Sequence, residues 1–168
     1  MNQLTSNTAT YNSESISSTK ANYPFFSSTF KYGVISGGLI AAFLFILQFA
    51  GMENNIGMKY FGYGLLGMVL AIGLTDYDQF LKTGTTFKSG MSFAAQITLF
   101  AGATIIAINA ITFLLGSSLV FSKYGVEVVD FSSLLMISGA IFLEIMVAGL
   151  IFTFITLQYL KSRKDYDG

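Results

Sequence analysis

Glu144 is the residue whose type and position are best suited to a chemical role. It is the only charged residue in the apolar run from Phe131 to Leu160. A charge in the middle of a membrane helix costs about 2.5–3.5 kcal/mol on insertion scales, so such residues usually face a partner and often carry function. The surrounding Leu, Ile, Phe and Val residues, at about −0.3 to −0.6 kcal/mol each, outweigh that cost. We expect a membrane-spanning helix whose carboxyl group serves either proton or cation coupling, or a structural hydrogen bond.

Asn109 is the expected partner of Glu144. Amides in membrane helices usually form hydrogen bonds between helices, worth about 0.6–2 kcal/mol. At a rise of about 1.5 Å per residue, the two side chains reach neighbouring depths if their antiparallel helices tilt. Ala140 and Ala148 flank Glu144 at intervals of four, so this narrow face is expected to turn toward a neighbouring helix. Desolvation then favours the neutral acid.

The rest of the residue inventory argues against catalysis. The chain has no histidine and no cysteine, which removes disulfides, thiolate and imidazole metal sites and the common nucleophilic dyads. Gly62 to Gly67 match the GxGxxG nucleotide fingerprint, but no strand is expected before them, and glycine-rich faces are common in membrane packing. Asp76 and Asp78 lack the further oxygen ligands of a calcium loop. We expect no enzyme, no cofactor and no metal.

Four apolar stretches are expected to position these residues. The fold class expected is an all-α, integral membrane bundle of four transmembrane helices. The second stretch is short for a bilayer core of about 30 Å, so a re-entrant segment is the alternative there. A polar N-terminal tail at 1–29 and a charged C-terminal tail at 161–168 flank a membrane domain at 30–160, whose spans cover about 30–51, 58–76, 91–115 and 131–160.

Small residues provide the expected packing faces. Gly33, Gly37 and Ala41 recur at intervals of four in the first span, which leaves one face nearly bare backbone. In lipid, such faces let helices approach closely, because packing drives their association. The pattern predicts a helix contact without naming the partner, which could be another span or another chain.

Basic residues set the expected orientation, because cytoplasmic loops carry an excess of Lys and Arg. Four spans place both termini on one side. That side would hold Lys20, Lys31, Lys82, Lys88, Lys161, Arg163 and Lys164, and the other side Lys59 and Lys123. We therefore expect both termini in the cytoplasm. The formal net charge of zero gives no reason to expect nucleic-acid binding.

Several short motifs recur in a characteristic order along the chain: Lys31-Tyr32-Gly33, Tyr77, Phe87-Lys88-Ser89-Gly90, Ser92-Phe93 and Lys161-Ser162-Arg163-Lys164. In these residues the chain resembles a family of small four-helix inner-membrane proteins of Bacteroidetes, a domain of unknown function. The resemblance implies a topology and no activity.

The function expected is that of a non-catalytic, multi-pass protein of the bacterial inner membrane. An accessory or scaffold subunit of a larger complex fits the small-residue faces and the missing catalytic inventory. Its expected partners are the lipid bilayer and other membrane subunits, with a homo-oligomer as a further option. The alternative is a small oligomeric transporter or channel that couples protons or cations through Glu144.

Overall fold

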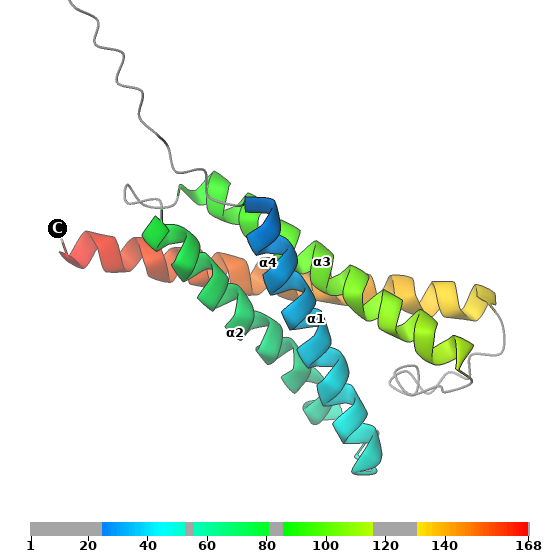
Figure 1. Ribbon diagram of the computed structural model, residues 1–168. Helices are drawn as coiled ribbons and strands as arrows, with labels where there is room; N and C mark the ends of the chain where they lie inside the picture. The colour runs from blue at the N-terminus through cyan, green and yellow to red at the C-terminus, as the bar shows by residue number, and fades with distance from the viewer. Residues whose placement is uncertain (1–24, 53–55, 81–85, 116–130, 168) are drawn as a thin grey trace, which may run out of the picture.

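The computed structural model describes residues 25–52, 56–80, 86–115 and 131–167, so residues 1–24 of the expected tail at 1–29 lie outside them. The described residues form four helices: α1 (Phe25–Phe49), α2 (Ile56–Phe80), α3 (Phe87–Leu114) and α4 (Phe131–Asp167). No strand occurs in these ranges, and each expected span coincides with a helix (Figure 1). The all-α prediction is therefore confirmed for the described part of the chain.

Three of the four helices, α1, α3 and α4, are long and apolar enough to cross a membrane, and α2 falls short. The reason lies in the composition of α2. Its middle carries glycines and tyrosines, which are less apolar than Leu or Ile, and Asp76 and Asp78 lie in its last turns. The hydrophobic Leu66, Leu70 and Leu74 nevertheless recur at intervals of four on its fully buried face.

Two helix boundaries differ from the expected ones. α1 begins at Phe25 instead of residue 30, directly after the only proline, and proline favours a helix start because its missing N–H needs no partner there. α4 continues to Asp167, so the expected C-terminal tail is largely helical. No glycine or proline interrupts that stretch, and basic residues near a helix C-terminus interact favourably with the helix dipole.

The helices form two hairpins that meet at one end and separate at the other (Figure 1). α1 pairs with α2, and α3 pairs with α4. The hairpins come together where α1 and α3 begin and where α2 and α4 end. Their shared core is filled by aliphatic residues and one aromatic ring, including Ile40, Leu66, Leu70, Leu74, Phe93, Ile97, Ala101, Ile105, Ile141 and Ile145.

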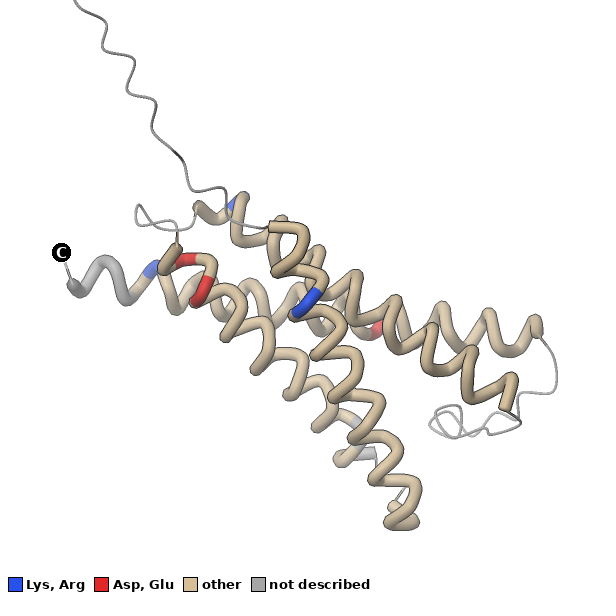
Figure 2. The backbone as a smooth tube through the Cα atoms, viewed as in Figure 1, with Lys and Arg blue, Asp and Glu red and all other residues tan. Residues whose placement is uncertain are grey.

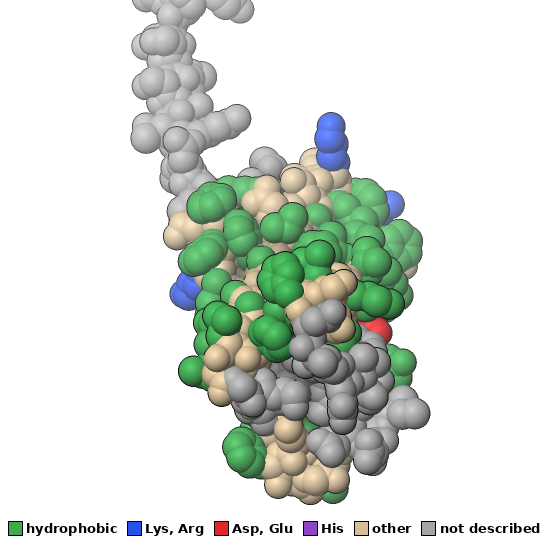
Figure 3. All heavy atoms as spheres, turned by 90° about the vertical axis from the view of Figure 1, so that its right-hand side faces the viewer, with side chains coloured by type: hydrophobic (Ala, Val, Ile, Leu, Met, Phe, Trp, Pro, Cys, Tyr) green, Lys and Arg blue, Asp and Glu red, His purple; other side chains and the backbone are tan. Residues whose placement is uncertain are grey.

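Charged residues cluster at the end where the hairpins meet. Figure 2 shows the acidic residues near the end of α2 there, with basic residues at the start of α3 and near the end of α4. Glu144 lies apart from them, near the middle of α4. Hydrophobic side chains dominate the described part of the face seen in Figure 3. Such a surface matches a lipid environment better than water.

Candidate site: the Tyr63–Glu144 pair and the helix contacts around it

The Tyr63 hydroxyl of α2 donates a hydrogen bond to Oε2 of Glu144 on α4. Both side chains are half-buried, at the contact between the two helices. The sequence reasoning missed Tyr63, because it interpreted Gly62-Tyr63-Gly64 only as a packing feature. The available signal was a phenol in the middle of an apolar stretch, since a tyrosine hydroxyl away from water needs a partner.

Asn109 does not contact Glu144, so the expected pairing is wrong. Asn109 is fully buried, and neither its Nδ2 nor its Oδ1 has a hydrogen-bond partner in the described part of the chain. Thr98 of α3 packs against Gly149 of α4. In that antiparallel register, Asn109 comes to the level of Ser138, well before Glu144 along α4.

The direction of Glu144 on α4 explains why it meets α2 instead of α3. Ile141, Ile145 and Gly149 recur at intervals of four on the buried side of α4. Gly149 identifies that side as the one facing α3. Glu144 precedes Ile145 by one residue, which turns it about 100° around the helix, toward α2. The carboxyl group therefore belongs to the α2–α4 contact.

Aromatic rings from α4 fill glycine positions on both neighbouring helices. A Cβ at Gly67 of α2 would lie 2.6 Å from the Phe152 ring, and a Cβ at Gly102 of α3 would lie 2.7 Å from the Phe142 ring. These distances are below those that real Cβ atoms tolerate, so both positions need glycine as the helices now pack. The two rings hold α4 against its neighbours above and below Glu144.

The small-residue face of the first span packs against α3. A Cβ at Gly37 would lie 2.7 Å from both the Ala101 carbonyl oxygen and the Thr104 Cβ, and a Cβ at Gly33 would lie 2.9 Å from the Ile97 carbonyl oxygen. Ala41, the third member of this face, is also buried. The partner of this face is thus a span of the same chain.

The alanines around Glu144 behave differently from one another. Ala148 is half-buried and packs against the core, whereas Ala140 is exposed. The described helices therefore do not cover Ala140, and its expected packing against a neighbouring helix stays a prediction. Ala140 belongs to the first third of α4, and α4 begins at the end where the two hairpins separate (Figure 1).

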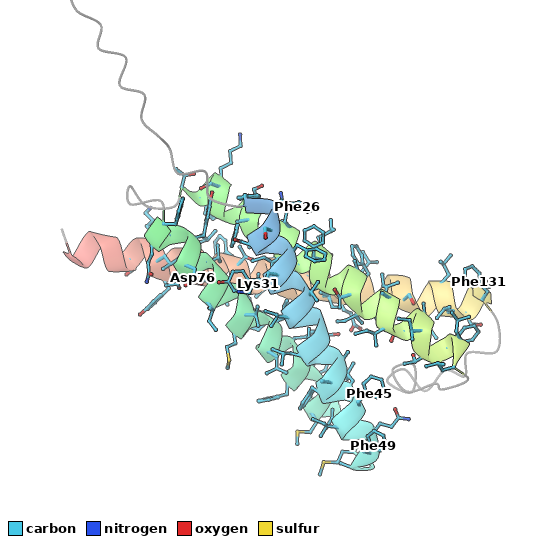
Figure 4. All side chains as sticks on the ribbon, viewed as in Figure 1. Phe26, Lys31, Phe45, Phe49, Asp76 and Phe131 are labelled. Atoms are coloured by element: carbon cyan, nitrogen blue, oxygen red, sulfur yellow. The ribbon has the colours of Figure 1, made fainter. Side chains whose placement is uncertain are left out.

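A second phenol–carboxylate bond lies at the end where the hairpins meet. The Tyr32 hydroxyl of α1 donates to Oδ2 of Asp76 on α2. Figure 4 places Asp76 beside the stretch of α1 that carries Lys31, far from Phe45 and Phe49 at the other end of α1. An aromatic cluster adjoins it, in which the rings of Tyr77 and Phe93 stack with centroids 4.5 Å apart and Phe25 meets both edge-on.

Most buried hydroxyl groups are satisfied within their own helices. The threonine hydroxyls donate to the carbonyl oxygen four residues earlier at Thr75, Thr98, Thr104, Thr153 and Thr156. Such bonds satisfy the hydroxyl without a partner helix. Other side chains form hydrogen bonds between helices: Tyr63 to Glu144, Tyr32 to Asp76, and Thr29 to Gln96 at 3.2 Å. These three tie α2 to α4, α1 to α2, and α1 to α3.

The described residues contain no group of three or more acidic, histidine or cysteine side chains that could hold a metal ion. The described helices are those of an all-α protein, and three of them are long and apolar enough to cross a membrane. No protein-family model, no curated protein and no solved structure matches the chain.

Proposed function

We propose that the protein is a non-catalytic, multi-pass membrane protein that serves as an accessory or scaffold subunit of a larger assembly in the bacterial inner membrane. The observation that carries this proposal is the bond between Tyr63 and Glu144. The acid that could have served as an isolated ion-coupling group is engaged in a contact between two helices. A carboxyl group that accepts such a hydrogen bond stabilises the contact between two helices of a bundle.

The proposal includes four membrane spans, with α2 as the least apolar of them. α2 packs antiparallel along α1, because Gly73 meets Tyr32 near one end and Gly62 meets Phe43 near the other. A helix that follows α1 over this length reaches nearly the same depth as α1. The exposed side of α2 also suits lipid, since it carries Met58, Phe61, Met68 and Ile72.

The proposed orientation has both termini in the cytoplasm. α1 begins, α2 ends, α3 begins and α4 ends at the same end of the structure (Figure 1), and that end carries Lys31, Lys88 and Lys161. This distribution supports the orientation, because basic residues favour the cytoplasmic side. The resemblance to the inner-membrane family of Bacteroidetes stays part of the proposal, and it accounts for topology alone.

A small proton- or cation-coupled transporter is the second candidate. It is favoured by the position of Glu144, a half-buried acidic residue near the middle of an apolar helix. Carboxyl groups within membrane helices mark proton and ion pathways in many carriers. Against this candidate, Glu144 is the only acidic residue in the middle of a described helix, and relays usually use several titratable groups.

Native mass measurement after extraction in mild detergent tests the accessory role. We expect the full chain to co-migrate with larger membrane subunits. Glu144→Gln is expected to weaken that assembly without changing ion flux in reconstituted vesicles. A protein that purifies alone, with a proton or cation flux that Glu144→Gln abolishes, would overturn the accessory role in favour of the transporter.

Single cysteines test the four-span topology, because the chain has none of its own. Met52→Cys, after α1, is expected to react with a membrane-impermeant thiol reagent added to intact cells. Lys88→Cys and Lys161→Cys are expected to react only after the membrane is permeabilised. If Met52→Cys and Lys88→Cys react from the same side, α2 does not cross the membrane.

A further inference from the structure

Two glycines that make α2 less apolar than its neighbours are also the points at which those neighbours pack. A Cβ at Gly67 would lie 2.6 Å from the Phe152 ring of α4, and a Cβ at Gly73 would lie 3.3 Å from the Tyr32 ring of α1. A leucine at either position would favour insertion into lipid more than glycine does, but the adjoining ring leaves it little room. α2 therefore lacks apolar side chains at the places where α1 and α4 pack against it.

Two polar side chains of α2 are likewise bonded to its neighbours. The Tyr63 hydroxyl donates a hydrogen bond to Glu144 of α4, and the Asp76 carboxylate accepts one from Tyr32 of α1. Both α1 and α4 are long and apolar enough to cross a membrane, whereas α2 falls short. The helix that falls short is thus bonded on two sides to helices that do not.

We infer that α2 crosses the membrane conditionally, held there by its contacts with α1 and α4. Without the bond from Tyr63 to Glu144, a share of the molecules adopts a form in which only α1, α3 and α4 span the membrane. Glu144 follows Tyr63 by 81 residues, which is a delay of about 4–16 s at a synthesis rate of about 5–20 residues per second. Features late in a chain can still decide its topology, as added C-terminal charges do.

The three-span form differs from the four-span form in the side on which the chain ends. With α2 left on the outer side, α3 and α4 are inverted, and the end of α4 faces outward with Lys161. The preference of basic residues for the cytoplasm opposes this form, so charge and hydrogen bonding favour the same topology. The inference rests on the four-span topology proposed above and adds what keeps α2 in place.

A single cysteine near the end of α4 reports the form that the full-length protein adopts. Ser162 is exposed, Ser162→Cys changes no charge, and the chain has no other cysteine. In intact cells, this thiol is expected to resist a membrane-impermeant reagent until the membrane is permeabilised. If the otherwise unchanged protein reacts from outside, the four-span topology is itself overturned, and this inference with it.

Glu144→Leu removes the acceptor on α4 and leaves the sequence of α2 unchanged. In the Ser162→Cys background, it is expected to raise the ratio of outward-facing to inward-facing ends of α4 about 3- to 30-fold, the factor that one interhelical hydrogen bond is worth. Tyr63→Phe is expected to raise the ratio by a similar factor. Because Tyr63→Phe also makes α2 more apolar, a span that depended on composition alone would shift in the opposite direction.

Tyr60→Phe is the matched control, since it makes the same change in α2 at a side chain that is 61% exposed. It is expected to leave the ratio unchanged or to lower it. Gly64→Leu provides a rescue, because a Cβ there would meet no heavy atom within 4 Å. Added to Tyr63→Phe, it is expected to restore the starting ratio by making α2 more apolar. Equal ratios for Glu144→Leu, Tyr63→Phe and Tyr60→Phe would overturn the inference.

Discussion

The Tyr63 hydroxyl donates a hydrogen bond to Glu144, which fastens α2 to α4. A bond of the same kind, from Tyr32 to Asp76, fastens α2 to α1. Among the four described helices, α2 alone is not apolar enough to qualify as a membrane span by composition, and it takes part in these two phenol–carboxylate bonds. Hydrogen bonds to neighbouring helices stabilise a segment that partitions weakly into lipid, because they add an attraction that lipid cannot replace.

Tyr63→Phe tests the bond to Glu144. The substitution keeps the ring and removes only the donor, so it is expected to lower the free energy of unfolding by about 0.6–2 kcal/mol. Titration with a denaturing detergent in mixed micelles measures this change. Tyr159→Phe is the control, because Tyr159 is exposed, and it is expected to have no effect.

Combining Tyr63→Phe with Glu144→Gln shows whether the two side chains act together. If the pair accounts for both losses, the double variant is expected to lose less stability than the sum of the single variants, because neighbouring residues are coupled. Strict additivity of the two losses would contradict a direct bond.

Gly37 and Gly38 offer a matched test of the α1–α3 contact. A Cβ at Gly37 would collide with the backbone and Cβ of α3, whereas a Cβ at Gly38 would meet nothing within 4 Å. Gly37→Ala is expected to destabilise the protein by about 1–3 kcal/mol, the usual cost of overpacking. Gly38→Ala is expected to be neutral or to stabilise by up to about 1 kcal/mol, because alanine is the better helix former. Equal effects in the same detergent titration would show that α1 does not pack on α3 through Gly37.

A similar pair tests the α3–α4 contact. A Cβ at Gly149 would lie 3.0 Å from the Thr98 Cβ and 2.5 Å from its Oγ1, whereas a Cβ at Gly139 would meet nothing within 4 Å. Gly149→Ala is expected to cost about 1–3 kcal/mol of unfolding free energy, and Gly139→Ala is not. Thr98→Ala is expected to recover much of the loss, because it removes the methyl and hydroxyl groups in the way. Failure of this rescue would mean that Gly149 is needed for another reason.

The helices and one of their contacts followed from local patterns. Apolar stretches of sufficient length predicted where helices form, and the spacing of Gly33 and Gly37 predicted a close helix contact. These features depend on neighbours along the chain, which the sequence displays directly. The boundaries at Phe25 and Asp167 were missed because hydropathy marks the edge of lipid, whereas hydrogen bonding continues a helix beyond it.

The partner of Glu144 could not be derived in the same way. The rise per residue along antiparallel helices placed Asn109 and Glu144 at similar depths in the membrane. It gave no information on which neighbouring helix each side chain faces. The side of α4 that meets α3 is set by Ile145 and Gly149, one residue away from Glu144 around the helix. That arrangement depends on how the two hairpins cross, which is a property of the whole bundle.

Asn109→Leu decides whether Asn109 contributes to the bundle through its amide. The amide is fully buried, and its polar atoms have no hydrogen-bond partner among the described residues. An unpaired buried polar group costs about 1–3 kcal/mol, and leucine removes that cost while keeping a side chain branched at Cγ. Asn109→Leu is therefore expected to leave the free energy of unfolding unchanged or to raise it by up to about 2 kcal/mol. Thr112→Val is the matched control. The buried Thr112 hydroxyl donates a hydrogen bond to the backbone carbonyl oxygen of Asn109 at 2.9 Å. Because this substitution removes a satisfied polar group, it is expected to raise the free energy of unfolding less than Asn109→Leu does. A loss of stability both in Asn109→Leu and in the smaller Asn109→Ala would instead mean that the amide bonds to a group outside the described residues, because only the leucine could lose stability by overpacking.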